Sequence, residues 1–297
     1  MGDERRLSWL TRFVPENYQE NFYVFFTNPV AIAGLVTVIA WVVIAIFDYR
    51  IAPYPGHAWV QTSLAERLQP PSLEHLCGTD HLGRDVFSMV VMGSRITIAS
   101  GIIPILTSLL IGVPLGAIAG FFGGNVETLI MRTTDVLLSL PTLVLAIAVC
   151  AVLGPSLQNA MLAMMVVWWP YYTRIIHGQT LALKEVMFVE AARGLGVSNW
   201  GIVQQHILPN CTSTIIVMFT MDLGFGILTM ASLGFIGVGA QPPSPEWGLA
   251  VSIGRTYMPD WWWMTFFPGL AIMSVVMAFN LLGNGLRDAL DPRRRSR

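Results

Sequence analysis

Residues 96–126 read ITIASGIIPILTSLLIGVPLGAIAGFFGGNV, and no side chain in this stretch is charged. A helix buried in a water-soluble protein is seldom apolar for so long, whereas crossing the hydrocarbon core of a bilayer takes about 20 apolar residues. Four more stretches without charge, all mostly apolar, occupy residues 30–47, 136–173, 223–245 and 261–286. The sequence therefore predicts an all-α integral membrane protein with several membrane-spanning helices.

The composition of the whole chain agrees with this prediction. Its 297 residues are 54% hydrophobic and only 12% charged. Soluble domains carry about 25% charged residues, so a water-soluble enzyme, a disordered chain and a nucleic-acid-binding protein are excluded. The three cysteines are Cys77, Cys150 and Cys211. Two of them lie in or beside apolar stretches, and an odd number this small indicates no disulfide framework.

We predict six transmembrane helices. The first covers residues 30–47, directly after Asn28-Pro29, and the second follows Arg95 and ends near Phe122. Glycine and proline recur within the second helix, which favours a kinked and closely packed helix. These residues are Gly101, Pro104, Gly112, Pro114, Gly116 and Gly120.

The other four predicted helices follow in two pairs. Gly154-Pro155 divides the charge-free stretch 136–173 into two halves, which we expect to form spans three and four in a tight hairpin. Span five opens with a proline and covers residues 209–233, and span six covers residues 264–286.

Basic residues indicate which ends of these helices face the cytoplasm, because arginine and lysine are enriched in cytoplasmic loops. With both termini inside, twelve basic residues lie on the cytoplasmic side and five lie outside. Three tryptophans at 261–263 then lie at the outer interface, where indole rings are favoured. The predicted segments are a cytoplasmic N-terminal interfacial segment (1–28), the first helix with its outer loop (29–95), a five-helix core (96–286) and a basic cytoplasmic tail (287–297).

The longest predicted cytoplasmic loop covers residues 178–209. From residue 188 the sequence reads FVEAARGLGVSNWGIVQQHILPN. Phe188, Ala191, Ala192 and Leu195 recur at helical spacing, so we expect them to form one apolar face of a short helix. Alanine keeps such a helix thin, and another protein could therefore approach its backbone closely. A short helix lying on lipid headgroups is the alternative, and the spacing alone does not decide between the two.

Polar residues and glycine complete this short helix. Glu190 and Arg193 lie on its other side, three residues apart. Gly196 follows in the position of a residue that ends a helix. Either Ser198 or Asn199 can cap a second helix, which we expect to end before the next proline.

The spacing in this loop resembles the EAA loop of the permease subunits of bacterial ABC importers. The matching residues are Glu190, Ala191, Ala192, Gly196, Leu208 and Pro209. The general pattern has isoleucine at the position of His206, and the peptide-importer branch commonly has HILPN there, as this chain does. Four further strings resemble the same family in the same order: GTDHLGRDVFS (78–88), DVLLSLPTLVLAI (135–147), LGFIGVGAQPPSPEWG (233–248) and FNLLGNGLRDALDPR (279–293). The chain is similar to the C-type permease of dipeptide and oligopeptide importers.

This resemblance implies a type I ABC importer permease fold, with six transmembrane helices and a cytoplasmic coupling-helix loop. In such importers two homologous permeases form the pathway, and two P-loop ATPase subunits sit beneath them. An extracytoplasmic binding protein delivers the substrate, here short peptides. The coupling helix would comprise Glu190, Ala191, Ala192, Arg193 and Gly196, docked in a groove of one ATPase. The protein would lie in the bacterial inner membrane among lipids, without a nucleic-acid partner.

We expect no enzymatic activity of this chain. A Walker A loop needs a lysine that reaches the phosphates, and Lys184, the only lysine, has no glycine nearby. ATP and Mg²⁺ would therefore be bound by the partner ATPases, and no cofactor is expected here. Nickel or another small solute is the alternative substrate, because nickel permeases share much of the motif set.

Two other groups of residues invite a functional interpretation. His75, Cys77, Asp80, His81 and Asp85 are of types that bind zinc. No other loop offers an obvious further ligand, and the family resemblance explains several of these residues as an ordered turn. We therefore predict no metal site.

Asp222 is the only acidic residue well inside a predicted span. Charged residues within a membrane are costly and often face a cavity, so Asp222 could line the pathway and meet a peptide's ammonium group. A carboxylate satisfied at a contact between helices is the alternative. A stand-alone secondary transporter would show inverted repeats and several such acids, and a membrane enzyme would need a nucleophile or metal set within its spans; the sequence shows neither.

Overall fold

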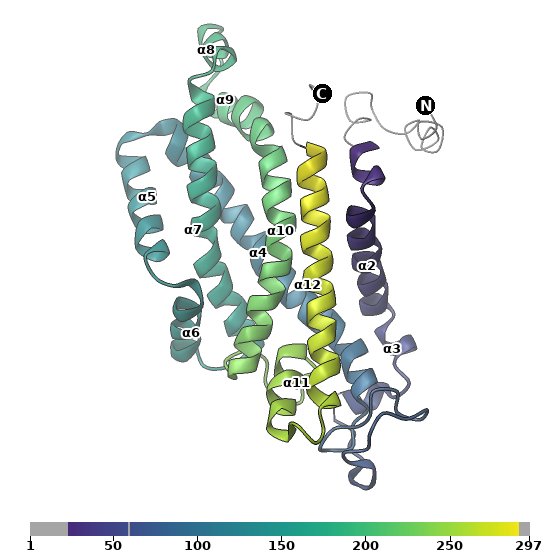
Figure 1. The fold of residues 1–297 in the computed structure, drawn as a ribbon. Helices are drawn as coiled ribbons and strands as arrows, with labels where there is room; N and C mark the ends of the chain where they lie inside the picture. Colours follow the sequence, from purple (N-terminus) through teal and green to yellow (C-terminus); the bar gives the residue numbers. More distant parts are fainter. Residues whose placement is uncertain (1–22, 59, 291–297) are drawn as a thin grey trace, which may run out of the picture.

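The computed structural model describes residues 23–58 and 60–290, and every regular element in that part of the chain is a helix. Long helices stand side by side in one bundle, with short helices at both ends (Figure 1). The long ones are α2 (Pro29–Ile46), α4 (Val86–Phe122), α5 (Gly124–Leu138), α6 (Thr142–Leu153), α7 (Leu157–Lys184), α10 (Leu208–Ile236) and α12 (Trp263–Leu290). The short ones are α3 (Asp48–Ile51), η2 (Pro55–Ala58), η3 (Leu64–Glu66), α8 (Met187–Gly194), α9 (Asn199–Ile202), the π-helix η4 (Val203–Ile207), α11 (Trp247–Gly254) and η5 (Arg255–Tyr257).

Within the described residues, four helical stretches are long and apolar enough to cross a membrane, and one bent pair of helices makes a fifth. The four are α2, α4, the stretch Asn199–Ile236 and α12, and the pair is α5 with α6. α7 is long enough at 28 residues, but its composition is less apolar than theirs. The structure thus confirms an all-helical membrane protein, while the sixth span stays a prediction.

The first two predicted spans are present, and the second is longer than predicted. Asn28 caps α2 by accepting hydrogen bonds from two backbone N–H groups in its first turn. α4 begins at Val86 rather than after Arg95, and it continues for 37 residues despite two internal prolines. Arg95 therefore lies within the helix and not in the outer loop. The predicted start was wrong because it was placed after the charged residue Arg95. Asp85, ten residues earlier, caps the helix by accepting a hydrogen bond from the N–H of Ser88.

Glycines every four residues along α4 allow it to lie very close to α7. A Cβ atom on Gly112 would stand 2.5 Å from the carbonyl oxygen of Trp169, and one on Gly116 would stand 2.6 Å from that of Thr173. A Cβ on Gly120 would be 2.7 Å from the side chain of Thr180. We call this contact the glycine seam. The frequent glycines of the second span therefore allow close packing, as predicted. They lie within one uninterrupted helix.

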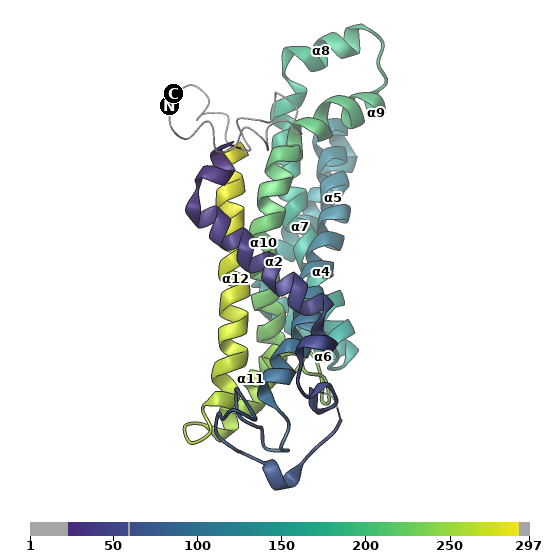
Figure 2. The same ribbon diagram turned by 90° about the vertical axis from the view of Figure 1, so that its right-hand side faces the viewer.

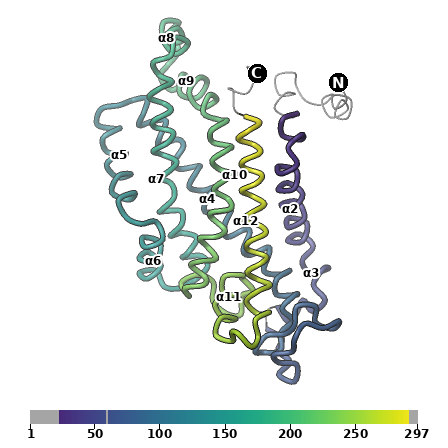
Figure 3. The backbone as a smooth tube through the Cα atoms, in the orientation of Figure 1, coloured from purple at the N-terminus to yellow at the C-terminus, as the bar shows by residue number. Residues whose placement is uncertain are grey.

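The third span differs from its prediction. The chain bends by 91° between α5 and α6 (Figure 3). α6 is only 12 residues long, so the predicted hairpin of two equal halves was wrong on its first side. The span becomes long enough only with α5, which contains Arg132, predicted to lie in the cytoplasm. The fourth helix does start after Gly154-Pro155 as predicted, where Ser156 caps α7.

The fifth and sixth helices also extend beyond their predicted limits. Ser198 caps α9, as one of the two predicted candidates. The helix does not end before Pro209 but continues through the π-helix η4 into α10. The wider π-helical turn lies directly before Pro209, which has no N–H for the regular α-helical hydrogen bond. α12 ends at Leu290 instead of residue 286.

The two ends of the bundle are different. α8 and α9 lie at the same end as the start of α2 and the end of α12, and α11 lies at the opposite end (Figure 1, Figure 2). This arrangement agrees with the prediction that the chain enters and leaves the bundle on the side of the EAA loop. Most of the predicted interfacial segment 1–28 and of the basic tail 287–297 lies outside the described residues.

We expect Gly112→Ala to lower the thermal stability of the protein, because its methyl group would meet the α7 backbone. Overpacking of this kind costs about 1–3 kcal/mol. Gly178→Ala in α7 is the control, since nothing lies within 4 Å of its Cβ position and alanine favours a helix by up to about 1 kcal/mol. Unfolding midpoints in detergent should fall only for Gly112→Ala. Equal midpoints would contradict the glycine seam.

Candidate functional sites

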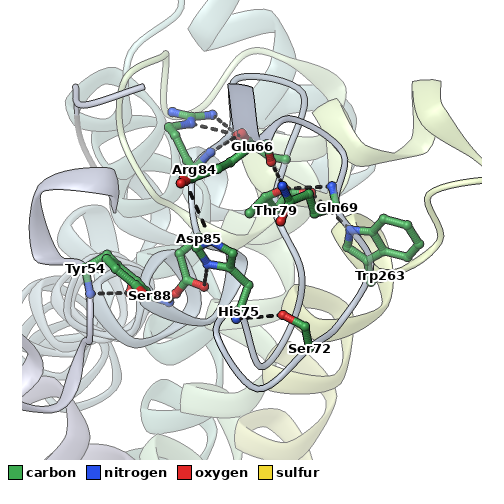
Figure 4. Close-up of polar contacts among 11 residues, drawn as sticks. Tyr54, Glu66, Gln69, Ser72, His75, Thr79, Arg84, Asp85, Ser88 and Trp263 are labelled. Atoms are coloured by element: carbon green, nitrogen blue, oxygen red, sulfur yellow. Dashed lines mark hydrogen bonds and ion pairs between the residues drawn. The ribbon is translucent and has the colours of Figure 1, made fainter. Parts of the chain in front are cut away.

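The segment between α2 and α4 folds into a compact cap at the end of the bundle opposite α8. We call residues 47–58 and 60–85 the outer cap. Its centre is a set of polar contacts that includes Trp263 of α12, whose indole N–H donates to the carbonyl oxygen of Thr79 at 3.0 Å (Figure 4). Trp263 is buried while its neighbour Trp262 is half exposed. The predicted interfacial role therefore does not hold for Trp263, which anchors the cap.

Two aspartates organise the last turn of the outer cap. Asp80 accepts hydrogen bonds from the backbone N–H groups of Leu82 and Arg84, each at 2.8 Å. Its other oxygen binds two nitrogens of the Arg84 guanidinium, both at 2.7 Å. Asp85 contacts His75 Nδ1 at 3.0 Å and accepts from the N–H of Ser88 at 2.7 Å (Figure 4). These contacts tie the cap to the first turn of α4.

The contacts of this cluster are those of an ordered turn. No group of three or more histidine, cysteine, aspartate or glutamate side chains that could hold a metal ion is found among residues 23–58 and 60–290. Asp80 and Asp85 are occupied by Arg84, His75 and backbone N–H groups instead. Burial, with a smaller effect of the charge on Asp85, raises the pKa of the Cys77 thiol to about 11, so this thiol is neutral at physiological pH.

We expect Asp80→Ala to destabilise the outer cap strongly, because it leaves the buried Arg84 guanidinium without its counter-charge. Removing one partner of a buried ion pair costs about 3–5 kcal/mol. Asp260→Ala, at an exposed position on the same side, is the control. The yield of monodisperse protein and its unfolding midpoint should drop only for Asp80→Ala; if both variants behave alike, the pair does not hold the cap.

α8 projects from the opposite end of the bundle, beyond α7 and α9 (Figure 1, Figure 2). Its inner side is held by Val189 and Ala192, which are buried against Ile202 and Ile207 in one apolar cluster. The rest of the helix is exposed, including Glu190. α8 is thus fixed at its base and free on its outer side.

The outer side of α8 is apolar, and the predicted single apolar face is divided. Ala192 faces the bundle, whereas Phe188, Ala191 and Leu195 are exposed, Leu195 to 86%. Met187 shares their side of the helix and is 82% exposed. We call these four exposed residues the outer α8 face. The prediction failed because Val189, which the spacing did not include, takes the inward position three residues before Ala192.

The end of α8 confirms the predicted role of Gly196 as a helix stop. Gly196 has φ +80°, a conformation that residues with a side chain rarely adopt. Its N–H donates to the carbonyl of Arg193 and the N–H of Val197 donates to that of Ala192, both at 3.1 Å, which is the Schellman arrangement. The Arg193 guanidinium lies over the ring of Phe121 in α4, 5.8 Å from its centre.

Two long helices hold the ends of this loop. α7 ends at Lys184, two residues before α8, and the Lys184 ammonium donates to the carbonyl of Gly120 at 3.2 Å. On the other side, α9 passes without a break into η4 and α10. α8 is thus connected to the ends of both α7 and α10 by short segments.

The second candidate site is a cavity with a volume of about 390 Å³ beside α10. Four helices and the start of α6 supply its walls. Its lining comprises Leu138, Thr142, Val167, Trp168, Tyr171, Met221, Asp222, Phe225 and Asn280. Leu138 and Thr142 flank the bend between α5 and α6, so this bend forms one side of the cavity. The structure thus places Asp222 at a cavity and near aromatic side chains, and not against a neighbouring basic residue of the described chain.

Sequence reasoning identified Asp222 but missed the residues around it. Trp168 and Tyr171 were counted only as part of an uncharged span. Their three-residue spacing places them on one helix face, but spacing does not show which face meets a cavity. Glu246 was also missed: it is buried and caps α11 through the N–H groups of Gly248 and Leu249.

Residues 112–296 match the family model described as binding-protein-dependent transport system inner membrane component. Residues 17–71 match the N-terminal TM domain of oligopeptide transport permease C. The first match covers most of the helical core, and the second covers α2 and the first part of the outer cap.

Three similar proteins are named as permease proteins of transport systems. The dipeptide transport system permease protein DppC of Alkalihalophilus pseudofirmus is 42% identical, covering 94% of this chain and 91% of its own. The probable D,D-dipeptide transport system permease protein DdpC of Escherichia coli is 43% identical, with 90% and 88% covered. The glutathione transport system permease protein GsiD of Pectobacterium atrosepticum is 41% identical, with 94% and 92% covered.

A solved structure shows a similar fold. The inward-facing MetNI methionine ABC transporter superposes with a TM-score of 0.56, covering 68% of this chain and 96% of that chain. The two sequences are only 18% identical, so this likeness concerns the fold alone.

Proposed function

The chain belongs to the family of inner membrane components of binding-protein-dependent transport systems, and we propose that it is the permease subunit of an ATP-driven importer for short peptides. As a permease it is not itself an ATPase. The transport names of its relatives, dipeptide and glutathione, favour a peptide-like substrate over nickel. The proposed complex also contains a second homologous permease, two P-loop ATPases that bind ATP and Mg²⁺, and an extracytoplasmic binding protein.

The outer α8 face carries this proposal. Four apolar side chains exposed on a short helix at one end of a bundle need a partner surface to cover them. Ala191 keeps the centre of that face flat, and Glu190, Arg193 and Gly196 lie at its margins. A groove in an ATPase subunit fits this face, with α8 as the coupling helix. Ala191 on this face and Glu190 and Gly196 at its margins also match the EAA pattern, so the geometry and the sequence point to one role.

The proposed mechanism follows from how α8 is attached. Nucleotide binding can shift the permease between conformations only if the ATPases contact its two states differently. α8 is a suitable point of contact, because it is packed against the ends of α7 and α10 through one apolar cluster. Closure of the ATPase dimer would move α8 as a rigid body and tilt both helices, as in other transitions in which packed helices shift together.

The proposed membrane arrangement has six spans, with both termini and α8 in the cytoplasm. α7 would be the fourth span, because it connects the end carrying the outer cap to α8 and is shielded along the glycine seam by α4. Its tryptophan and tyrosine side chains lower its mean hydropathy, while its 28 residues are enough to cross a bilayer. The excess of arginine on the α8 side supports this orientation.

In proteoliposomes that contain the complete transporter, binding protein and ATP should drive uptake of a labelled dipeptide but not of Ni²⁺. We expect Leu195→Asp to reduce this uptake at least tenfold, since burying a new charge in an interface costs about 2 kcal/mol or more. Leu195 is exposed, so the isolated permease should remain stable. Leu73→Asp, at a position 99% exposed in the outer cap, is the matched control. Full uptake with Leu195→Asp, together with normal binding of the ATPases, would contradict the role of α8.

Two substitutions at Gly196 distinguish a requirement for its backbone conformation from a requirement for a residue without a side chain. Open space surrounds its Cβ position, so its φ angle and not its size limits substitution within the permease. We expect Gly196→Asn, which tolerates this φ angle, to keep transport, and Gly196→Leu to lose transport and ATPase stimulation while expression is unchanged. Normal uptake by Gly196→Leu would refute the coupling role, and loss in both variants would show that the partner needs a bare backbone here.

A further inference from the structure

We propose that the cavity at the α5–α6 bend binds the protonated amino group of the transported peptide, with Asp222 as its counter-charge. This proposal rests on the proposed function and specifies which part of the substrate the permease contacts. It assigns recognition of a primary ammonium group to this subunit, in addition to the selection made by the binding protein. The residues concerned are Asp222 together with the aromatic rings of Trp168, Tyr171 and Phe225.

Within the part of the chain that the structure describes, Asp222 has neutral neighbours but no cation. Its Oδ2 atom is buried without a hydrogen bond of standard geometry in the described chain, as are Trp168 Nε1 and Tyr172 OH. Trp168 and Tyr172 supply neutral donors and no positive charge. Neutral donors do not compensate a negative charge inside a membrane, where an unpaired charge is costly.

The other acids that face α7 show what is missing at Asp222. Glu127 on α5 contacts His177 Nε2 at 2.8 Å, and Asp135, two turns along α5, forms an ion pair with Arg174. Each of these acids therefore receives a basic partner from α7.

Aromatic residues follow these basic residues along α7 towards the cavity. Successive members of the series His177, Arg174, Tyr171 and Trp168 are three residues apart and therefore neighbours on the helix surface, and the series winds around about half of the helix. The first two meet an acid, whereas the next two line the cavity that contains Asp222. No arginine, lysine or histidine of residues 23–58 and 60–290 forms an ion pair with Asp222. An ion pair at Asp222 therefore needs a cation from outside the described residues.

The cavity walls indicate the kind of cation. Aromatic rings attract ammonium groups through their faces, and the rings of Trp168 and Phe225 lie 5.3 Å apart. A divalent metal ion would need several oxygen ligands, and the lining offers one carboxylate among mostly apolar side chains. A volume of about 390 Å³ holds a small organic ligand. An alkylammonium group at the end of a short peptide fits both the charge and the walls.

A ligand can reach this site from the side of the bundle. Phe225 is 52% exposed and Tyr171 is 43% exposed, although both line the cavity. Thr142, just after the bend, is exposed as well. In the proposed complex this side would face the pathway between the two permeases, which would bring a passing peptide next to Asp222.

Charge-selective labelling tests the site directly. Thr142→Cys places a reactive thiol on the cavity wall, and the native Cys77, Cys150 and Cys211 are buried. In the assembled transporter, we expect an ammonium-bearing methanethiosulfonate to modify this cysteine about tenfold faster than a sulfonate-bearing one, because a carboxylate nearby attracts the former and repels the latter. Adding Asp222→Asn should remove the preference. Equal rates with Asp222 present would overturn the proposal.

Transport provides the second test. Asp222→Asn should lower dipeptide uptake at least tenfold while ATP hydrolysis stimulated by the binding protein continues, and Asp222→Glu should restore much of the uptake. Normal uptake with Asp222→Asn would overturn the ammonium site but not the permease function. If the unmodified complex transports no peptide, the proposed function itself fails, and the labelling experiment still decides whether the cavity attracts a cation.

Discussion

Close contact between the backbones of α4 and α7 is the constraint on which the rest of this structure depends. Lipid tails are as apolar as leucine, so helices in a bilayer associate through tight packing and not through burial from water. Gly112, Gly116 and Gly120 provide that packing. α4 extends about 55 Å at 1.5 Å per residue, which is longer than the roughly 30 Å of hydrocarbon. One helix therefore reaches from the outer cap to the base of α8.

This single helix connects the two functional ends of the molecule. At one end, Asp85 caps α4 and joins it to the polar network of the outer cap. At the other, Ala117 and Phe121 belong to the apolar cluster that contains Val189 and Ala192 of α8. The seam keeps α7 aligned with α4, and α7 carries both the last turn before α8 and the aromatic side of the cavity. Motion at α8 would therefore act on the walls around Asp222.

Local signals in the sequence predicted several helix boundaries correctly. Asn28-Pro29 and Gly154-Pro155 with Ser156 mark the starts of α2 and α7, because capping depends on neighbouring residues. Boundaries failed where they depended on distant contacts. The third span was placed by counting uncharged residues, yet Arg132 and Asp135 lie within it on α5. Asp135 is accommodated by an ion pair with Arg174 on α7, a partner that no window of sequence reveals.

The sequence alone determined that the chain is a membrane protein and that Asp222 is an isolated acid within a span. It also identified the loop that carries the EAA pattern. These conclusions rest on composition, spacing and local helix chemistry, all of which act over a few residues. Only the tertiary structure decided that Phe188 and Leu195 face outward and that Asp222 meets aromatic rings at a cavity. Periodicity identifies the residues that share a helix face, but the neighbouring helices determine whether that face is buried, paired or left open to a ligand.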